Sequence, residues 1–337
     1  MKINTLLITL LVVVLFTASA QGYTKEEVVK RGVLQCGVST GTPGFSTVDA
    51  AGNWSGLDVD ICRAVAAATL GDGEKVEFLP LAANESFTAL LSGEVDILAR
   101  HAIWTFTRDS ALAVHFTGTS YYDGQGFLVS KKLGVKEAGD LRKVKVCSSV
   151  GSQSEVNLKD YFQRNKVDYK LVPYDSEELA VKGFEGGACE LLSLPQSRLY
   201  GILLELDDPE SAEVLPDVFT KEPLGPVVRQ GDDVWFNIVK WCLFAMINGE
   251  ELGVTSLNID EMKLSHKLDI KRLFGFEGSG GKGVGLRSDW AAEIIRQVGN
   301  YGEVFEKNLG AESPLKIERG LNRLWSRGGV QYAPPLR

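Results

Sequence analysis

An arginine and a short glycine-serine loop are the parts of this sequence best suited to hold a small anion. Arg108 follows a mostly apolar run at residues 95–99, and a guanidinium offers two parallel N–H donors to a carboxylate. Residues 151–154 read Gly-Ser-Gln-Ser between a predicted strand and a predicted helix, so their backbone N–H groups can form an anion-binding nest. A surface salt bridge with Asp109 is the alternative for Arg108. The loop favours capture of a carboxylate.

Other motifs look catalytic but lack the setting that catalysis needs. Residues 37–41 match G-x-S-x-G, yet Thr42 and Pro43 follow where a nucleophile elbow needs a helix. Residues 278–283 match G-x-G-x-x-G but lie late in the chain, outside any strand-helix-strand opening, and are predicted to form a loop. The three histidines and the cysteines show no zinc-binding spacing. The sequence therefore predicts neither a metal nor a cofactor.

The first half of the mature chain alternates predicted strands and helices. Strands are expected at residues 32–38, 76–79 and 95–99. The helix between the first two is predicted to begin at Asp58 and end at Gly71, and the next to begin at Asn84 and end at Gly93. This alternation is typical of a parallel sheet.

A second alternating run starts at residue 144. Strands are expected at 144–148, 169–172 and 190–194, with helices at 155–165 and 177–184 between them. Residues 120–126, with Gly124 and Gly126, and residues 216–223 are the expected crossings between the two runs. We therefore predict an α/β protein with two lobes, each a mainly parallel sheet with flanking helices, joined by a two-crossing hinge. Lobe 1 is assigned residues 24–121 plus 222–337, including a C-terminal helical extension, and lobe 2 is assigned residues 122–221.

The N-terminus and the charge limit where the protein works and what it contacts. Residues 1–20 carry Lys2, an apolar run and a small-residue cleavage site, which is typical of a cleaved secretory signal peptide and predicts a periplasmic protein. The formal net charge of −8, without a long basic run, argues against nucleic acid and anionic membrane surfaces as partners. A monomer is expected. Residues 234–247 are predicted to be a core helix and not a membrane span.

Five cysteines in an exported chain predict disulfides with one thiol left over. We expect Cys147 to pair with Cys189, and as a second choice Cys36 with Cys62, since each pair falls within one predicted lobe. Cys242 then remains buried in its helix.

Several stretches resemble the general L-amino-acid-binding periplasmic proteins of ABC importers. The matching segments cover nearly the whole mature chain; they are residues 56–60, 87–96, 121–126, 221–226, 229–233, 299–302, 319–322 and 328–337. The resemblance implies a bilobed solute-binding protein that hands a small carboxylate, an amino acid or a derivative, to an inner-membrane ABC permease. It implies no cofactor and no chemistry of the protein's own.

The same resemblance assigns roles to individual residues. Phe45 is expected over the apolar part of the ligand and Arg108 on its α-carboxylate. The Ser152 hydroxyl and the Gln153 amide are expected on the same carboxylate.

Two positions depart from the family's pattern. Ile103 stands where a carboxylate-binding threonine is usual, and Pro195 stands where an aspartate usually holds the ligand's ammonium. A desolvated ammonium without a charged partner is strongly unfavourable, so plain amino acids should bind poorly and an anionic or N-substituted ligand is expected. His101 and Arg198 are candidate additional contacts. Alternatively, another acid has taken over the ammonium, and Glu190 and Glu222 are the candidates.

Two other classes of function stay open at this level. An enzyme on the same fold, of the dehydratase kind, would need an acid or base in the cleft, for which His101, Glu190 and Glu222 are the candidates. A ligand-sensing module that docks to a membrane receptor would share the same pocket. The transport receptor, and not an enzyme, is the expectation that the motifs support best.

Overall fold

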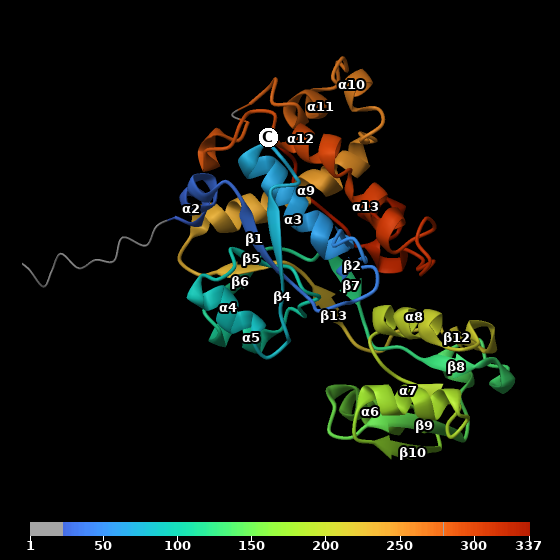
Figure 1. Ribbon diagram of the computed structural model, residues 1–337. Helices are drawn as coiled ribbons and strands as arrows, with labels where there is room; N and C mark the ends of the chain where they lie inside the picture. Colours follow the sequence, from blue (N-terminus) through green and yellow to red (C-terminus); the bar gives the residue numbers. More distant parts are fainter. Residues whose placement is uncertain (1–22, 279) are drawn as a thin grey trace, which may run out of the picture.

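The computed structural model describes residues 23–278 and 280–337 and shows two α/β lobes side by side (Figure 1). The predicted signal peptide, residues 1–20, lies outside the described residues. None of the described helices is long and apolar enough to cross a membrane. The expected two-lobed architecture is confirmed.

The first lobe is built on a mixed sheet of five strands. Its order is β4 (Val76–Pro80), β1 (Leu34–Val38), β5 (Ile97–Leu98), β14 (Val227–Arg229) and β6 (Val114–Phe116). The first three strands are parallel, whereas β14 pairs antiparallel with both β5 and β6. The other elements of this half are α2 (Thr24–Arg31), the hairpin β2 (Thr47–Val48) and β3 (Trp54–Ser55), α3 (Leu57–Leu70), α4 (Ser86–Ser92) and α5 (Phe106–Ala111).

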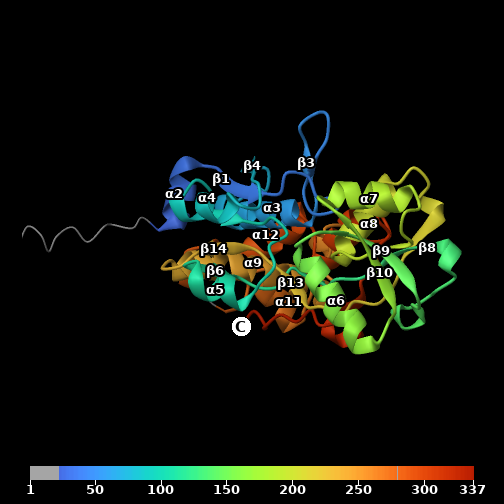
Figure 2. The same ribbon diagram turned by 90° about the horizontal axis from the view of Figure 1, so that it is seen from below.

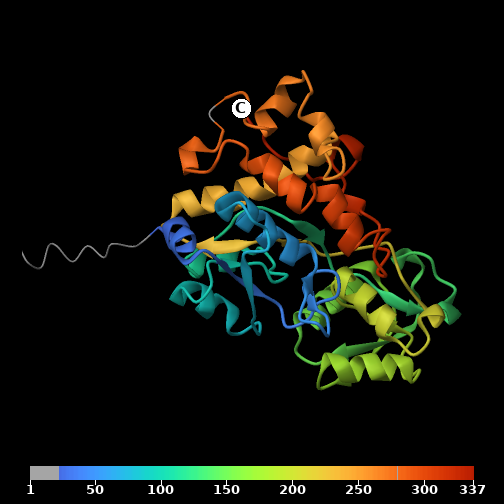
Figure 3. The ribbon, with the colours of Figure 1, turned by 45° about the horizontal axis from the view of Figure 1, so that its top comes forward.

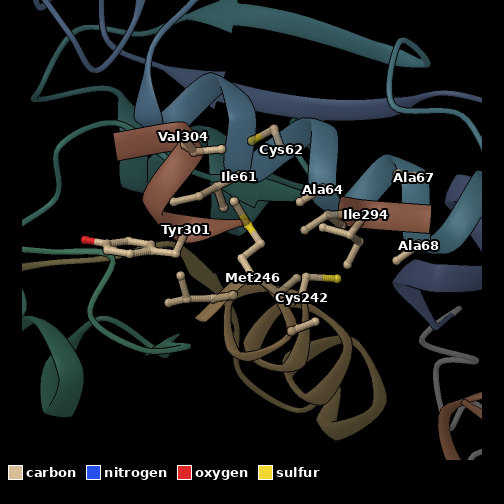
Figure 4. Close-up of a cluster of buried hydrophobic side chains, with 14 of the residues drawn as sticks. Ile61, Cys62, Ala64, Ala67, Ala68, Cys242, Met246, Ile294, Tyr301 and Val304 are labelled. Carbon is tan, nitrogen blue, oxygen red and sulfur yellow. The ribbon is translucent and has the colours of Figure 1, made fainter. Parts of the chain in front are cut away.

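Helices from the C-terminal third cover this sheet and complete its core (Figure 3). They are α9 (Asp233–Leu252), α10 (Ile259–Met262), α11 (Leu268–Leu273), α12 (Trp290–Gln297) and α13 (Tyr301–Asn308), with short 3₁₀ turns at Lys282–Val284, Gly320–Asn322 and Trp325–Arg327. Figure 4 shows Met246 of α9 pointing toward Ile61 of α3, with Tyr301 of α13 in the same cluster. The predicted core helix around residues 234–247 is thus confirmed, because it carries one side of the largest apolar cluster.

The second lobe repeats the arrangement with a smaller sheet. Its order is β10 (Tyr169–Tyr174), β9 (Val144–Ser149), β11 (Leu191–Leu192), β8 (Leu128–Ser130) and β12 (Ala212–Val214). Strands β10, β9 and β11 are parallel, and β8 is antiparallel to both β11 and β12. Its helices are α6 (Gln153–Asn165), α7 (Glu177–Glu185) and α8 (Gln196–Glu205), with 3₁₀ turns at Lys131–Leu133, Ala138–Asp140 and Pro209–Ser211.

Two short strands carry the chain from one lobe to the other and back. These strands, β7 (Tyr121–Asp123) and β13 (Glu222–Leu224), form a separate antiparallel pair that we call the crossing ribbon. Figures 1 and 2 show it between the two sheets. The predicted pair of crossings is confirmed.

Element boundaries differ from the predictions where a local motif outweighs periodicity. The expected N-cap Asp58 lies inside the first turn of α3, which begins after Gly56. Gly56 has a φ of 132°, and a Cβ there would lie 2.1 Å from the Phe45 carbonyl oxygen, so only glycine fits this entry. Asn84 likewise does not cap α4, which begins at Ser86. The predicted left-handed helix end at Gly71 is confirmed.

Both predicted disulfides form. Cys36 on β1 is bonded to Cys62 on α3, and Cys147 on β9 is bonded to Cys189 just before β11. Cys242 is free and fully buried in α9, and burial raises the pKa of its thiol. Each lobe is therefore crosslinked within itself and no disulfide among the described residues restrains the lobes relative to each other.

The thiol count predicts a simple alkylation pattern. Native oxidised protein should take up no iodoacetamide, the denatured oxidised protein one equivalent at Cys242, and the denatured reduced protein five, read by intact mass. Cys242→Ala is the matched control and should lose one equivalent in both denatured samples. More than one equivalent in denatured oxidised wild-type protein would contradict the pairing.

Candidate functional site

The carboxyl ends of β1 and β5 meet the crossing ribbon at an aromatic cluster. Phe45, in the loop after β1, is 1% exposed, and its ring contacts the rings of His101 and Tyr121 edge-on, with centroids 4.4 and 5.2 Å away. The backbone N–H of Asp58 donates to the Phe45 carbonyl at 3.0 Å and holds the loop against α3. The expected apolar contact residue thus stands where the first lobe joins the ribbon.

Hydrogen bonds through one serine join the two lobes and the ribbon. The Ser197 hydroxyl, on α8, donates to Asp123 Oδ2 at 2.5 Å and lies 2.9 Å from His101 Nε2. Asp123 Oδ1 also accepts from the backbone N–H groups of Gly124 and Ser197, at 2.9 and 3.3 Å. This is not a nucleophile triad, because the carboxylate binds the serine and not the imidazole. The contact instead connects α8 of the second lobe to the crossing ribbon and to His101 of the first lobe.

Burial shifts the pKa of three groups around this contact. Burial raises the pKa of Asp123 to about 7 and the pKa of Asp58 to about 7, although hydrogen bonds from Ser197 and from the His101 backbone act in the opposite direction. Burial, aided by the positive charge of Arg100, lowers the pKa of His101 to about 4. The imidazole is therefore neutral near pH 7 and contributes a hydrogen bond and not a charge.

Arg108 is held in place by its own loop. Thr105 caps α5 by accepting from the Arg108 N–H at 3.3 Å, and Arg108 Nη1 donates to the Ile103 carbonyl at 2.8 Å. The guanidinium lies 5.6 Å from the centre of the Phe87 ring, and burial lowers the pKa of Arg108. Ile103 therefore contributes a backbone acceptor that orients the arginine, and its side chain supplies no donor. The described residues include no ion pair between Arg108 and Asp109.

A second arginine, which the sequence analysis did not single out, lies close to the first. Arg100 comes two residues after the end of β5, and its buried Nε has no hydrogen-bond partner among the described residues. Burial lowers the pKa of Arg100 and so does the positive charge of Arg108, while Asp58 raises it. Its position directly after a buried central strand was the available signal in the sequence. Two guanidinium groups thus share this edge of the first lobe.

The expected anion nest on the second lobe is partly occupied by the protein itself. The Gly151 N–H donates to Glu155 Oε2 at 2.7 Å, and Ser152 caps α6 by accepting from the Glu155 N–H at 3.1 Å. Gln153 Nε2 donates to Asn157 at 2.9 Å. The expectation of a free nest at Gly151 is therefore wrong, because an acidic residue three positions after the cap folds back onto the loop. Ser152 and Gln153 remain at the N-terminus of α6.

The other candidate side chains lie in different settings. Pro195 precedes α8 and forms an isolated bridge with Gln125, while Arg198 Nε donates to Glu177 at 2.8 Å, so its charge is already paired. Glu190 precedes β11 at the end remote from Pro195 and accepts from the Lys145 N–H at 2.7 Å. Glu222 lies on the ribbon itself.

The described part of the chain brings together no group of three or more His, Cys, Asp or Glu side chains suited to hold a metal ion. Ser39, the serine of the G-x-S-x-G match, hydrogen bonds to the hydroxyls of Thr42 and Ser46 at 2.8 and 2.5 Å, and neither of these partners is a general base. The site that remains is one for binding: an aromatic ring, two arginines and an inter-lobe contact.

The lowered pKa of His101 predicts a pH-dependent contribution to stability. The unfolded chain binds the imidazole proton below about 6.5, whereas the folded chain binds it only below about 4, so acidification through this window should cost up to about 3 kcal/mol at this residue. His101→Asn keeps a residue that tolerates the left-handed backbone, φ 58°, and removes this loss.

Urea unfolding from pH 7 to pH 4 checks the His101 prediction. The stability of wild type relative to His101→Asn should fall as the pH decreases, while His266→Asn, at an exposed histidine, should follow wild type. Parallel curves for all three proteins would show that His101 titrates normally.

Comparison with known proteins supports a transport role. Residues 34–255 match the bacterial extracellular solute-binding proteins, family 3. The chain is 50% identical over 338 residues to the putative amino-acid ABC transporter-binding protein YhdW of Escherichia coli K12, covering 100% of this chain and 99% of that protein. It is 49% identical over 322 residues to the general L-amino acid-binding periplasmic protein AapJ of Rhizobium johnstonii, covering 95% and 94%.

A solved structure extends the similarity to three dimensions. An ABC transporter periplasmic binding protein from Brucella ovis with glutathione bound has 47% sequence identity and a TM-score of 0.84, covering 93% of this chain and 99% of that one. These relatives are named as binding proteins of transporters and not as enzymes, which confirms the receptor class over the enzymatic alternative. The chain belongs to family 3 of the bacterial extracellular solute-binding proteins.

Proposed function

We propose that this protein is the periplasmic receptor of an ABC importer for an amino-acid derivative that carries at least two carboxylates, with glutathione as the reference compound. The relatives named as amino-acid transport proteins and the Brucella ovis protein with glutathione bound support this class of ligand. The departures at Ile103 and Pro195 remove a carboxylate donor and an ammonium partner that are usual in the family, so other residues of this chain must meet the charges of the ligand.

The pair formed by Arg100 and Arg108 carries the proposal. Both guanidinium groups follow β5, and burial together with the charge of Arg108 lowers the pKa of Arg100 while Asp58 raises it. Neither arginine forms an ion pair in the described part of the chain, and the buried Arg100 Nε has no hydrogen-bond partner there. Two half-buried positive charges without a carboxylate in direct contact are costly, and a ligand with two carboxylates would offset that cost through charge-assisted hydrogen bonds. Phe45 would cover the apolar part of such a ligand, and Ser152 and Gln153 would contact it from the second lobe.

Closure of the lobes would link capture to delivery. We assign residues 24–121 plus 222–337 to one moving body and residues 122–221 to the other, with the crossing ribbon as the hinge. A ligand that binds both bodies favours the closed state, because it makes contacts that the open state lacks. The permease would then recognise the closed form. A cleaved leader at residues 1–20 would place the monomeric protein in the periplasm.

Thermal melting against a ligand panel tests the proposed ligand class. Glutathione at a hundredfold excess over its Kd should stabilise the mature protein by about 2.7 kcal/mol and raise its Tm by roughly 5 to 10 °C. L-leucine, L-lysine and glycine betaine at equal concentration should raise it far less. Equal shifts with neutral amino acids, or no shift with any carboxylate, would contradict the proposal.

Charge-removing variants test the arginine pair. Arg100→Gln and Arg108→Gln should each weaken glutathione binding about 10- to 100-fold, the effect of losing a charge-assisted hydrogen bond, as measured by titration calorimetry. Arg164→Gln, at an exposed arginine paired with Asp160 on α6, is the matched control and should bind like wild type. Unchanged affinity in both cleft variants would place the ligand elsewhere.

A further inference from the structure

We propose that Glu222 on the crossing ribbon binds the ligand's ammonium group and replaces the aspartate that Pro195 removes. This inference rests on the proposed function, because it names the partner of a second charge on the same ligand. It makes the cleft a site for a zwitterion with an extra carboxylate, and not for a simple dianion.

One oxygen of the Glu222 carboxylate has no partner. Oε1 accepts from the Thr220 hydroxyl at 3.0 Å, while Oε2 is buried and forms no hydrogen bond within the described residues. A buried carboxylate oxygen without a donor loses its hydration and gains nothing in exchange. The atom is therefore suited to a donor that arrives with the ligand, and an ammonium supplies both the proton and the opposite charge.

The strand register puts Glu222 on the face of the ribbon that carries the lobe contact at Asp123. Glu222 pairs directly with Asp123 across the ribbon, so both side chains leave the same face. On that face Asp123 Oδ2 lies 3.8 Å from His101 Nε2. The Trp104 N–H donates to the Pro223 carbonyl at 2.7 Å, so the segment that leads to Arg108 runs along β13. β13 thus positions both Glu222 and the segment that leads to Arg108.

The other acids near the cleft are already engaged. Asp123 accepts from the Ser197 hydroxyl and from two backbone N–H groups, so its lone pairs are in use. Asp58 accepts from the His101 N–H at 2.7 Å and lies at the start of α3. Glu190 is at the remote end of β11. Among the described acids of this region, Glu222 is the one with a buried oxygen left over.

The electrostatic setting also favours a cation beside Glu222. Burial raises the pKa of Glu222, and the Glu222 charge in turn raises the pKa of Asp123 across the ribbon. An ammonium bound to Glu222 would offset the negative charge that Glu222 places near Asp123. Since Ser197 of α8 covers this face through Asp123, separation of the lobes would give the ligand access to it.

Two matched pairs of ligands isolate the ammonium. L-glutamate and glutarate differ only by the ammonium, and so do glutathione and glutaryl-cysteinylglycine. Titration calorimetry on wild type, Glu222→Gln and the control Glu190→Gln gives a Kd for each compound. The amide introduced by Glu222→Gln keeps the size of the side chain and an acceptor for Thr220, and retained binding of the deaminated ligands shows that the cleft is intact.

Glu222→Gln should weaken glutathione or L-glutamate about 10- to 100-fold and leave their deaminated analogues within about twofold of wild type. Glu190→Gln should change neither. Suppose that wild type binds both members of a pair. If Glu222→Gln then changes the two Kd values equally, or changes neither, the role of Glu222 is overturned while the proposed function stands. Failure of wild type to bind any of the four compounds would overturn the proposed function as well.

Discussion

The antiparallel pairing of β7 with β13 is the constraint on which the rest of this structure depends. The chain passes between the lobes twice, and the two passes bond to each other, so the two sheets stay connected while no disulfide of the described chain crosses between them. The ribbon also fixes the position of the arginine segment, because Ile103 and Trp104 bond to β13. Asp123, Glu222 and the segment that leads to Arg108 are therefore all positioned by this one pair of strands.

The cost of burying charge gives the site its chemistry. Arg100 Nε and Glu222 Oε2 are both buried without hydrogen-bond partners among residues 23–278 and 280–337, one positive and one negative. The protein interior screens charges less well than water, so burying such a group without a partner costs free energy. The same group binds an oppositely charged part of a ligand strongly. A protein that binds by enclosing its ligand gains from this arrangement, since the ligand completes the missing contacts only when the lobes meet.

The sequence predicted those features that depend on local pattern. The alternating elements, the core helix α9 and both cysteine pairs follow from periodicity and from which elements lie adjacent in an α/β lobe. It did not predict which partner each polar side chain chooses. Asp58 was expected to cap its helix, but it accepts from His101, 43 residues away in sequence. Glu155 accepts from the Gly151 N–H and so occupies part of the nest expected at residues 151–154, and Arg198 is paired with Glu177 from another helix. Arg100 was overlooked because its lack of a partner is a property of the folded site.

A crystal structure of the mature protein grown with glutathione tests the central claim most directly. The account predicts one ligand between the lobes, with carboxylate oxygens within about 3 Å of the guanidinium groups of Arg100 and Arg108 and the ammonium within about 3 Å of Glu222. A ligand bound outside the cleft, or one whose carboxylates avoid both arginines, would contradict it.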